Sequence, residues 1–153
     1  MGIQLNFGDH VAKYNNYFRP IPVQYRADAQ WARAQAKAIA NTMPSANAYF
    51  RSLGAGRTLS SLLNDGRIWV NYYTLPPQGV AWHNEIGISH YPFNEGRLKV
   101  LGILIHELAH IAGAMEDTTK AEDALVHCGL GTLQELNTQI NDPTTPYDPG
   151  IKG

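Results

Sequence analysis

The chain has little cysteine, no excess of either charge and no long hydrophobic segment, and each of these absences excludes a class of protein. The single cysteine, Cys128, cannot form an intrachain disulfide, so the fold does not depend on disulfide bonds. Twelve Lys and Arg against thirteen Asp and Glu leave a net charge of −1, without a block of like charge that would follow nucleic-acid phosphates. We therefore expect no nucleic-acid partner.

The sequence also contains neither a membrane span nor an N-terminal export signal. Its most apolar run, VLGILI at residues 100–105, is far shorter than the roughly 20 residues needed to cross a bilayer. The N-terminus, MGIQLNFGDH, lacks the basic segment followed by an apolar one that marks a Sec-type signal peptide. We expect a soluble protein, and any export would have to use a route without such a signal unless the chain is one domain of a longer protein.

Hydrophobic periodicity predicts helices in the first half of the chain. Residues 25–43 place an apolar stripe at helical spacing, opposite a face of basic residues. The stripe consists of Trp31, Ala34, Ala38, Ile39 and Thr42. Shorter helices are expected at 45–53 and 57–66, where Gly, Asn and Asp residues end them.

The pattern then changes to that of β-strands. Residues 67–75 are rich in aromatic and β-branched side chains, and residues 79–89 alternate between two faces. The sequence predicts two strands joined through PPQG, at residues 76–79, in a small antiparallel sheet.

The next predicted helix is the most apolar of the chain. It begins at Asn94 as the N-cap, and apolar residues cover most of its circumference, so we expect it to be central and buried. Gly113 ends it. A further helix over residues 120–140 follows a turn in which Thr118 or Thr119 serves as the cap, and the glycines of GLG divide it.

The buried helix carries the motif HELAH at residues 106–110. Residues four apart share a helix face, so His106 and His110 can bind one ion while Glu107 lies beside it. Catalytic zinc keeps three protein ligands and a water, from which a glutamate can remove a proton. The alternative is a pair of ordinary core or solvated histidines, but three polar side chains on so apolar a helix need partners. The motif therefore predicts two zinc ligands and a general base.

Several residues compete to be the third zinc ligand. Glu122, in the first turn of the next helix, can face His110 across the roughly 8–10 Å that separates packed helix axes, and we favour it. Glu116 completes HExxHxxGxxE, which imitates the metzincin spacing with Glu in place of His or Asp. The remaining candidates are Asp117, Asp123 and His127.

Two further features belong to the expected site. The strand at residues 82–89 either lies along the rim of the cleft, where an extended peptide can add to it, or is an ordinary edge strand. A donor for the developing oxyanion is also expected near the metal. The candidates are Tyr72, Tyr73, His83, His90, Tyr91 and Tyr147.

Residues 66–131 resemble a known family. The run GRIWVNYYTL, IGIS, GRLKVLGILIHELAHIAGA and AEDALVHCGLG is similar to the small zincin metallopeptidase domains, gluzincin-like with close ligand spacing, found in bacterial polymorphic toxins. These include rearrangement-hotspot (Rhs) and type VI secretion effectors. The resemblance implies Zn²⁺ held by His106, His110 and Glu122, with Glu107 as the base. It also implies delivery by a secretion system into a competing cell and a cognate immunity protein as partner.

Taken together, these features predict a single zincin-like α+β domain over residues 1–153. It would comprise an N-terminal helical part (1–48), a catalytic core (49–140) and a turn-rich tail (141–153). The expected function is a zinc metallopeptidase that hydrolyses peptide bonds through a metal-activated water. The alternatives are a zinc amidase acting on cell-wall peptides and a non-catalytic module in which zinc clamps two helices, with Cys128 or His127 as a fourth ligand.

Overall fold

Five short strands form a mixed sheet in the computed structural model, which describes residues 2–13, 16–76, 78–140 and 142–147. The strands lie in the order β1 (Gln4–Leu5), β3 (Trp69–Tyr73), β5 (Glu85–Ile88) and β4 (Gly79–Trp82), with β2 (Phe18–Arg19) also paired to β3. β1 and β5 run parallel to β3, whereas β2 runs antiparallel to β3 and β4 antiparallel to β5. The prediction of a single α+β domain is confirmed, but the sheet is mixed and not antiparallel.

The difference arises from a turn inside the segment that was predicted as one strand. His83 and Asn84 connect β4 to β5, and His83 adopts a left-handed backbone with φ of 57°. β5 folds back between β4 and β3, where it runs parallel to β3. Trp82 pairs with Glu85 across the turn, so the two side chains share a face, whereas one continuous strand would place them on opposite faces. All four residues of β5 are buried, so the pattern of residues 79–89 could not reveal this change. Pro77, in the predicted connection, lies outside the described residues.

The helices follow the predicted segments closely, except for α4, which the sequence did not predict. They are α1 (Arg26–Thr42), α2 (Pro44–Arg51), α3 (Leu59–Leu63), α4 (His90–Glu95), α5 (Arg97–Ile111), α6 (Lys120–His127) and α7 (Leu133–Thr138), with a 3₁₀ turn at Val23–Tyr25. The expected division of residues 120–140 is confirmed, because α6 and α7 are separate. Asn94 is not the cap of the buried helix: it lies in α4, and Gly96, with φ of 113°, separates α4 from α5. Within the predicted tail, residues 142–147 are turn-like, whereas 141 and 148–153 lie outside the described part.

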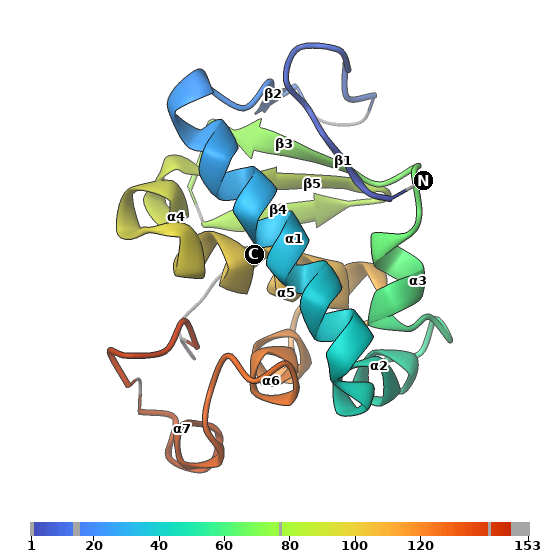
Figure 1. The fold of residues 1–153 in the computed structure, drawn as a ribbon, viewed down its shortest axis with the longest axis vertical. Helices are drawn as coiled ribbons and strands as arrows, with labels where there is room; N and C mark the ends of the chain where they lie inside the picture. Colours follow the sequence, from blue (N-terminus) through green and yellow to red (C-terminus); the bar gives the residue numbers. More distant parts are fainter. Residues whose placement is uncertain (1, 14–15, 77, 141, 148–153) are drawn as a thin grey trace.

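The N-terminal part, residues 1–48, contains the predicted helix α1 and also β1 and β2, which join the sheet. Each of these strands has two residues, too few for a periodic pattern. The buried stripe of α1 is different from the predicted one. It consists of Ala29, Ala32, Ala36 and Ala40. α1 packs on α5, and Figure 1 shows the two helices crossing. The small alanine side chains on this surface of α1 allow the two helices to approach closely.

α5 is the central element of the fold, as its sequence predicts. Every residue from Val100 to Ala109 is buried, and the helix packs against α1, α4, α6, β4 and β5. In Figure 1, α1 crosses in front of the sheet, while α6 and α7 lie at the end of the molecule away from β2. None of the helices in the described part of the chain is both long enough and apolar enough to cross a membrane.

The end of α5 is defined by Gly113 and by the loop between α2 and α3. Gly113 has φ of 116°, and a Cβ atom at this position would clash with the carbonyl oxygen of Leu53. The Ala55 amide donates to the Ala112 carbonyl at 3.0 Å. The α2–α3 loop therefore lies directly against the last turn of α5, which places Arg57 beside the histidine motif.

Candidate metal centre

His106 and His110 bring their Nε2 atoms to within 3.2 Å of each other on the last turns of α5. His106 is 1% exposed, and His110 is half-buried. Two nitrogen ligands at about 2.05 Å from a tetrahedral zinc would be about 3.3 Å apart. The separation of the two ring nitrogens therefore fits a shared zinc ion.

The turn after α5 orients the second histidine. His110 Nδ1 donates a hydrogen bond to the Ala114 carbonyl at 2.8 Å, and the Ala114 amide in turn donates to the Ala109 carbonyl at 3.0 Å. A proton on Nδ1 leaves Nε2 with the lone pair that a metal requires. The left-handed backbone of Gly113 turns the chain so that the Ala114 carbonyl reaches His110. The glycine that ends the helix therefore also helps to orient His110 as a ligand.

Glu107 lies in the interior between α5 and β4. It is completely buried, and neither carboxylate oxygen has a hydrogen-bond partner among the described residues. β4 approaches so closely that a Cβ at Gly79 would lie 3.0 Å from Glu107 Oε2. Burial, and then the charges of Glu116 and Glu122, raise the pKa of Glu107 well above its ordinary value. Buried carboxylates are normally hydrogen-bonded, so one without a partner in the protein is suited to contact a bound water, ion or substrate.

The structure brings together the motif residues but not the third ligand. Among the described residues, His106, Glu107 and His110 offer metal-binding atoms that all lie within 4.8 Å of one another. Glu122, in the first turn of α6, and Glu116, in the turn before it, are outside this group. Both are near enough to affect Glu107 electrostatically. Glu122 as third ligand therefore stays a prediction.

α6, which carries Glu122, is held in place by Tyr49 of α2. The Tyr49 hydroxyl donates to the Lys120 carbonyl at 2.7 Å, and its ring stacks on His127 with 4.0 Å between centroids. Asp123 accepts a hydrogen bond from the Thr119 hydroxyl at 3.1 Å. The two contacts of Tyr49 lie in the first and last turns of α6, so α2, together with the packing of α6 on α5, sets the position of Glu122. Nothing in the sequence pattern singles out Tyr49 for this role.

The other ligand candidates are engaged in contacts of their own. The ring of His127 is stacked on Tyr49, and Cys128 is buried, which raises the pKa of its thiol to about 12. Asp117 is exposed in the turn before α6. Neither His127 nor Cys128 joins the group formed by the motif residues among the described part of the chain.

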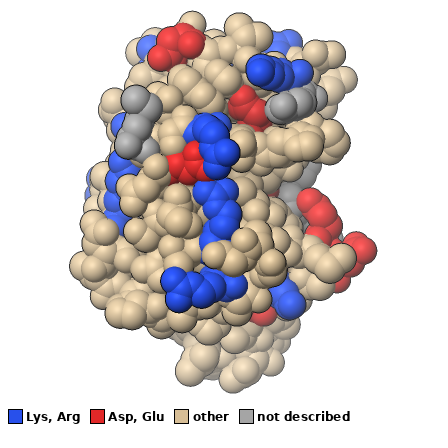
Figure 2. Space-filling view, turned by 90° about the vertical axis from the view of Figure 1, so that its right-hand side faces the viewer, with Lys and Arg blue, Asp and Glu red and all other residues tan. Residues whose placement is uncertain are grey.

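An open cleft of about 660 Å³ lies beside His110. Ala81, His83 and Asn84 of the β4–β5 hairpin line one side of it, and Arg57, Glu116 and Asp117 line it from two other segments. Figure 2 shows the face at the right of Figure 1, where Lys and Arg side chains gather in a band down the middle and acidic side chains project from the right-hand edge. Arg57 on the one hand and Glu116 and Asp117 on the other give the lining of the cleft charges of both signs.

His83 is the oxyanion-donor candidate that the structure brings to this cleft. Of the six predicted residues, all of which are described, none but His83 lines it. Tyr147 is fully buried, Tyr72 and Tyr73 pack against phenylalanine rings, and the rings of His90 and Tyr91 contact each other on α4. The left-handed conformation of His83 places it at the tip of the hairpin, which explains how it reaches the cleft.

Asp65 anchors the basic side of the cleft. Its buried carboxylate accepts hydrogen bonds from the Arg57 and Arg67 side chains, each at 2.8 Å to Oδ2, and from the Arg67 backbone and Nε at Oδ1. The hydrogen bonds from Arg67, reinforced by that from Arg57, hold the pKa of Asp65 well below its usual range. A carboxylate with a lowered pKa stabilises the fold at any pH above its unfolded value of about 4, and this contribution is lost as the pH falls further.

We expect Asp65→Asn to lower the free energy of unfolding by about 1–2 kcal/mol at pH 7, less than a fully buried pair would cost because Arg67 is exposed to solvent. Urea unfolding at several pH values measures this. The difference from the parent should shrink as the pH falls below about 4, because the unfolded parent then takes up a proton on Asp65 while the folded parent, with its lowered pKa, still holds the charge. A difference that stays constant down to pH 2 would contradict this assignment.

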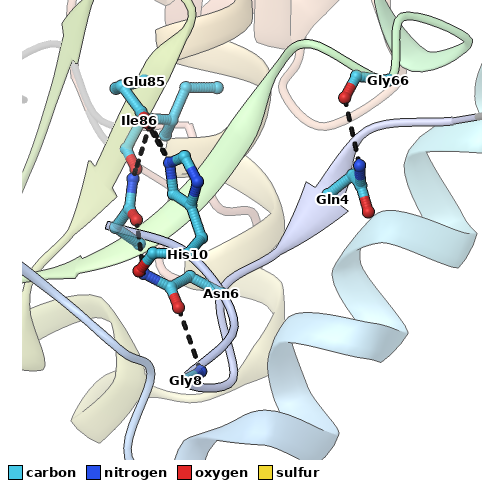
Figure 3. Close-up of polar contacts among 8 residues, drawn as sticks. Gln4, Asn6, Gly8, His10, Gly66, Glu85 and Ile86 are labelled. Carbon is cyan, nitrogen blue, oxygen red and sulfur yellow. Dashed lines mark hydrogen bonds and ion pairs between the residues drawn. The ribbon is translucent and has the colours of Figure 1, made fainter. Parts of the chain in front are cut away.

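A second polar cluster lies on the sheet and fixes the N-terminal segment. His10 Nε2 is bonded to the Glu85 carboxylate, and the His10 ring stacks on Trp69 at 4.0 Å. Asn71 donates to Glu85 Oε2 at 3.3 Å and accepts from Asn6 at 2.8 Å, so these groups satisfy one another (Figure 3). Glu85 directly follows the turn that lines the cleft. The cluster is therefore a support for the hairpin, which the sequence did not predict.

Comparison of the chain with protein-family models, with curated proteins and with solved structures finds no match in any of the three. The assignment of a function therefore depends on the geometry of the centre and its cleft.

Proposed function

We propose that the protein is a zinc-dependent metallopeptidase. The observation that carries the proposal is the convergence of the His106 and His110 Nε2 atoms, 3.2 Å apart, beside the buried Glu107 carboxylate. Two imidazoles one helix turn apart are suited to bind one zinc ion, and a carboxylate beside them is suited to act as the general base. Glu122 is the favoured third ligand, from the first turn of α6.

The chemistry assigned to the residues follows from their positions. Zinc, when bound, polarises a carbonyl group and lowers the pKa of water. Glu107 accepts a proton from the attacking water and passes it to the leaving nitrogen. A nearby cation favours the charged form of a carboxylate, which opposes the effect of burial on Glu107. His83 donates a hydrogen bond to the developing oxyanion from the other side of the cleft.

An extended peptide is the substrate that suits the cleft. β4 is an edge strand that pairs with β5 alone among the described strands, so its outer backbone groups face away from the sheet. One residue of β4, Gly79, lies next to Glu107, and another, Ala81, lines the cleft beside His110. A peptide that pairs with β4 would therefore pass the metal centre with its backbone held in an extended form.

The proposal is tested by hydrolysis assays with and without zinc. We expect the purified protein to cleave a denatured protein substrate, to lose this activity on chelation and to regain it with one equivalent of zinc. Purified peptidoglycan, digested in parallel, separates a peptidase from an amidase acting on cell-wall peptides. A protein that binds zinc yet hydrolyses neither substrate would favour the non-catalytic zinc clamp. Delivery as a secreted toxin and an immunity partner stay predictions from the resemblance.

A further inference from the structure

Arg57 differs from the other groups lining the cleft because its charge is not neutralised by its ion-pair partner. Asp65 receives three hydrogen bonds from Arg67, two of them from the side chain in a bidentate arrangement, but only one from Arg57. Two guanidinium groups thus share a single carboxylate, and the set of three residues has a net charge of +1. Because Arg67 makes the bidentate contact, the negative charge of Asp65 is neutralised mainly by Arg67.

The same contacts hold the Arg57 side chain in place. Its Nη2 donates to Asp65 at 2.8 Å, and its side chain is 26% exposed. Nε and Nη1 of Arg57 have no hydrogen-bond partner among the described residues. A guanidinium that is ordered, half-buried and still able to donate is a suitable receptor for a planar anionic group such as a carboxylate.

The location of Arg57 connects this receptor to the metal centre. Arg57 lines the cleft together with His110 and the hairpin tip, and the packing of the α2–α3 loop on Gly113 fixes that position. The acids of the cleft, Glu116 and Asp117, belong to the turn before α6. No ion pair joins them to Arg57 among the described residues. The positive and negative sides of the cleft are therefore formed by different segments.

We propose that Arg57 binds a carboxylate of the peptide substrate close to the bond that is cleaved, with Asp65 and Arg67 as positioning residues. This inference rests on the proposed function and names its substrate class: acidic peptides. The carboxylate is either an Asp or Glu side chain or the C-terminus of the peptide, since a guanidinium recognises both in the same way. The acids in the turn before α6 disfavour a carboxylate on their side, so the two charges orient the peptide.

The test measures binding separately from hydrolysis. Glu107→Gln, loaded with zinc, is titrated with labelled peptide pairs that differ in one residue, Glu against Gln, at successive positions. A second pair differs in a free or amidated C-terminus. We expect one acidic peptide to bind at least about tenfold more tightly than its neutral partner, the effect of one charge-assisted hydrogen bond. The second pair distinguishes the C-terminus from a side chain as its source.

Arg57→Gln, in the same background, should abolish this discrimination, while Arg57→Lys should retain part of it as a point charge. Arg51→Gln is the matched control, because Arg51 is exposed at the end of α2 and outside the cleft lining. Thermal unfolding of each variant establishes that it is folded. Equal binding of acidic and neutral peptides, or equal losses in the Arg57 and Arg51 variants, would overturn the inference.

The two proposals fail in different ways. If the parent protein cleaves peptides with zinc but neither kcat/KM nor binding distinguishes acidic from neutral sequences, the inference is wrong and the proposed function stands. If acidic peptides bind through Arg57 but no peptide is cleaved, the proposed function is wrong and the recognition of a carboxylate stands.

Discussion

Replacing Glu107 with Gln is expected to lower kcat for peptide hydrolysis by about 10²–10⁴-fold, the contribution of a general acid–base group. The amide preserves the size of the side chain but cannot accept the proton. Glu107 is completely buried, with both oxygens lacking partners among the described residues, so few other interactions change. Initial rates at saturating peptide, measured on zinc-loaded protein, provide the result.

Zinc content and thermal stability are the controls for this variant. Glu107 is assigned as a base and not as a ligand, so Glu107→Gln should retain one zinc per chain. Its melting temperature should not fall, because an amide is less costly to bury without a partner than a carboxylate. Unchanged kcat in the zinc-loaded variant would remove Glu107 from the mechanism. Loss of zinc would instead make it a ligand.

The parts of the site that the sequence predicted are those governed by local rules. His106 and His110 are four residues apart, and helical geometry alone brings their rings to one face. Gly113 marks the end of the helix because a left-handed residue is required there. These rules involve few neighbouring residues, so a single sequence contains all the information that they need.

The parts that were missed depend on contacts between distant segments. Arg57 reaches the cleft because the α2–α3 loop packs against Gly113, and no periodic pattern contains that contact. The alanine stripe of α1 does not stand out in the sequence because small residues indicate a close helix contact only once the partner, α5, is known. The mixed sheet results from a turn at His83, which the sequence pattern does not show because both faces of β5 are buried. In each case the missing information is the identity of the neighbour.

The identity of the third zinc ligand depends both on the local sequence spacing and on how α6 packs against α5. Two matched substitutions, at Glu122 and Glu116, distinguish the candidates. Glu122→Ala is expected to weaken zinc binding by more than about 100-fold, since changes to groups that only support a ligand already cost about 10–100-fold. Glu116→Ala removes the same charge from the turn before α6 and should weaken zinc binding by less than about tenfold, through long-range electrostatics alone.

Competition with a chelator of known zinc affinity measures both values. Alanine is a favourable helix residue, so α6 should persist in Glu122→Ala, where Tyr49 still anchors its first turn at Lys120. The opposite ranking, with zinc lost in Glu116→Ala and retained in Glu122→Ala, would place the third ligand in the turn, as in the metzincin-like spacing HExxHxxGxxE. Equal, small effects would mean that neither acid is a ligand. Glu122 would then act on Glu107 only through its charge.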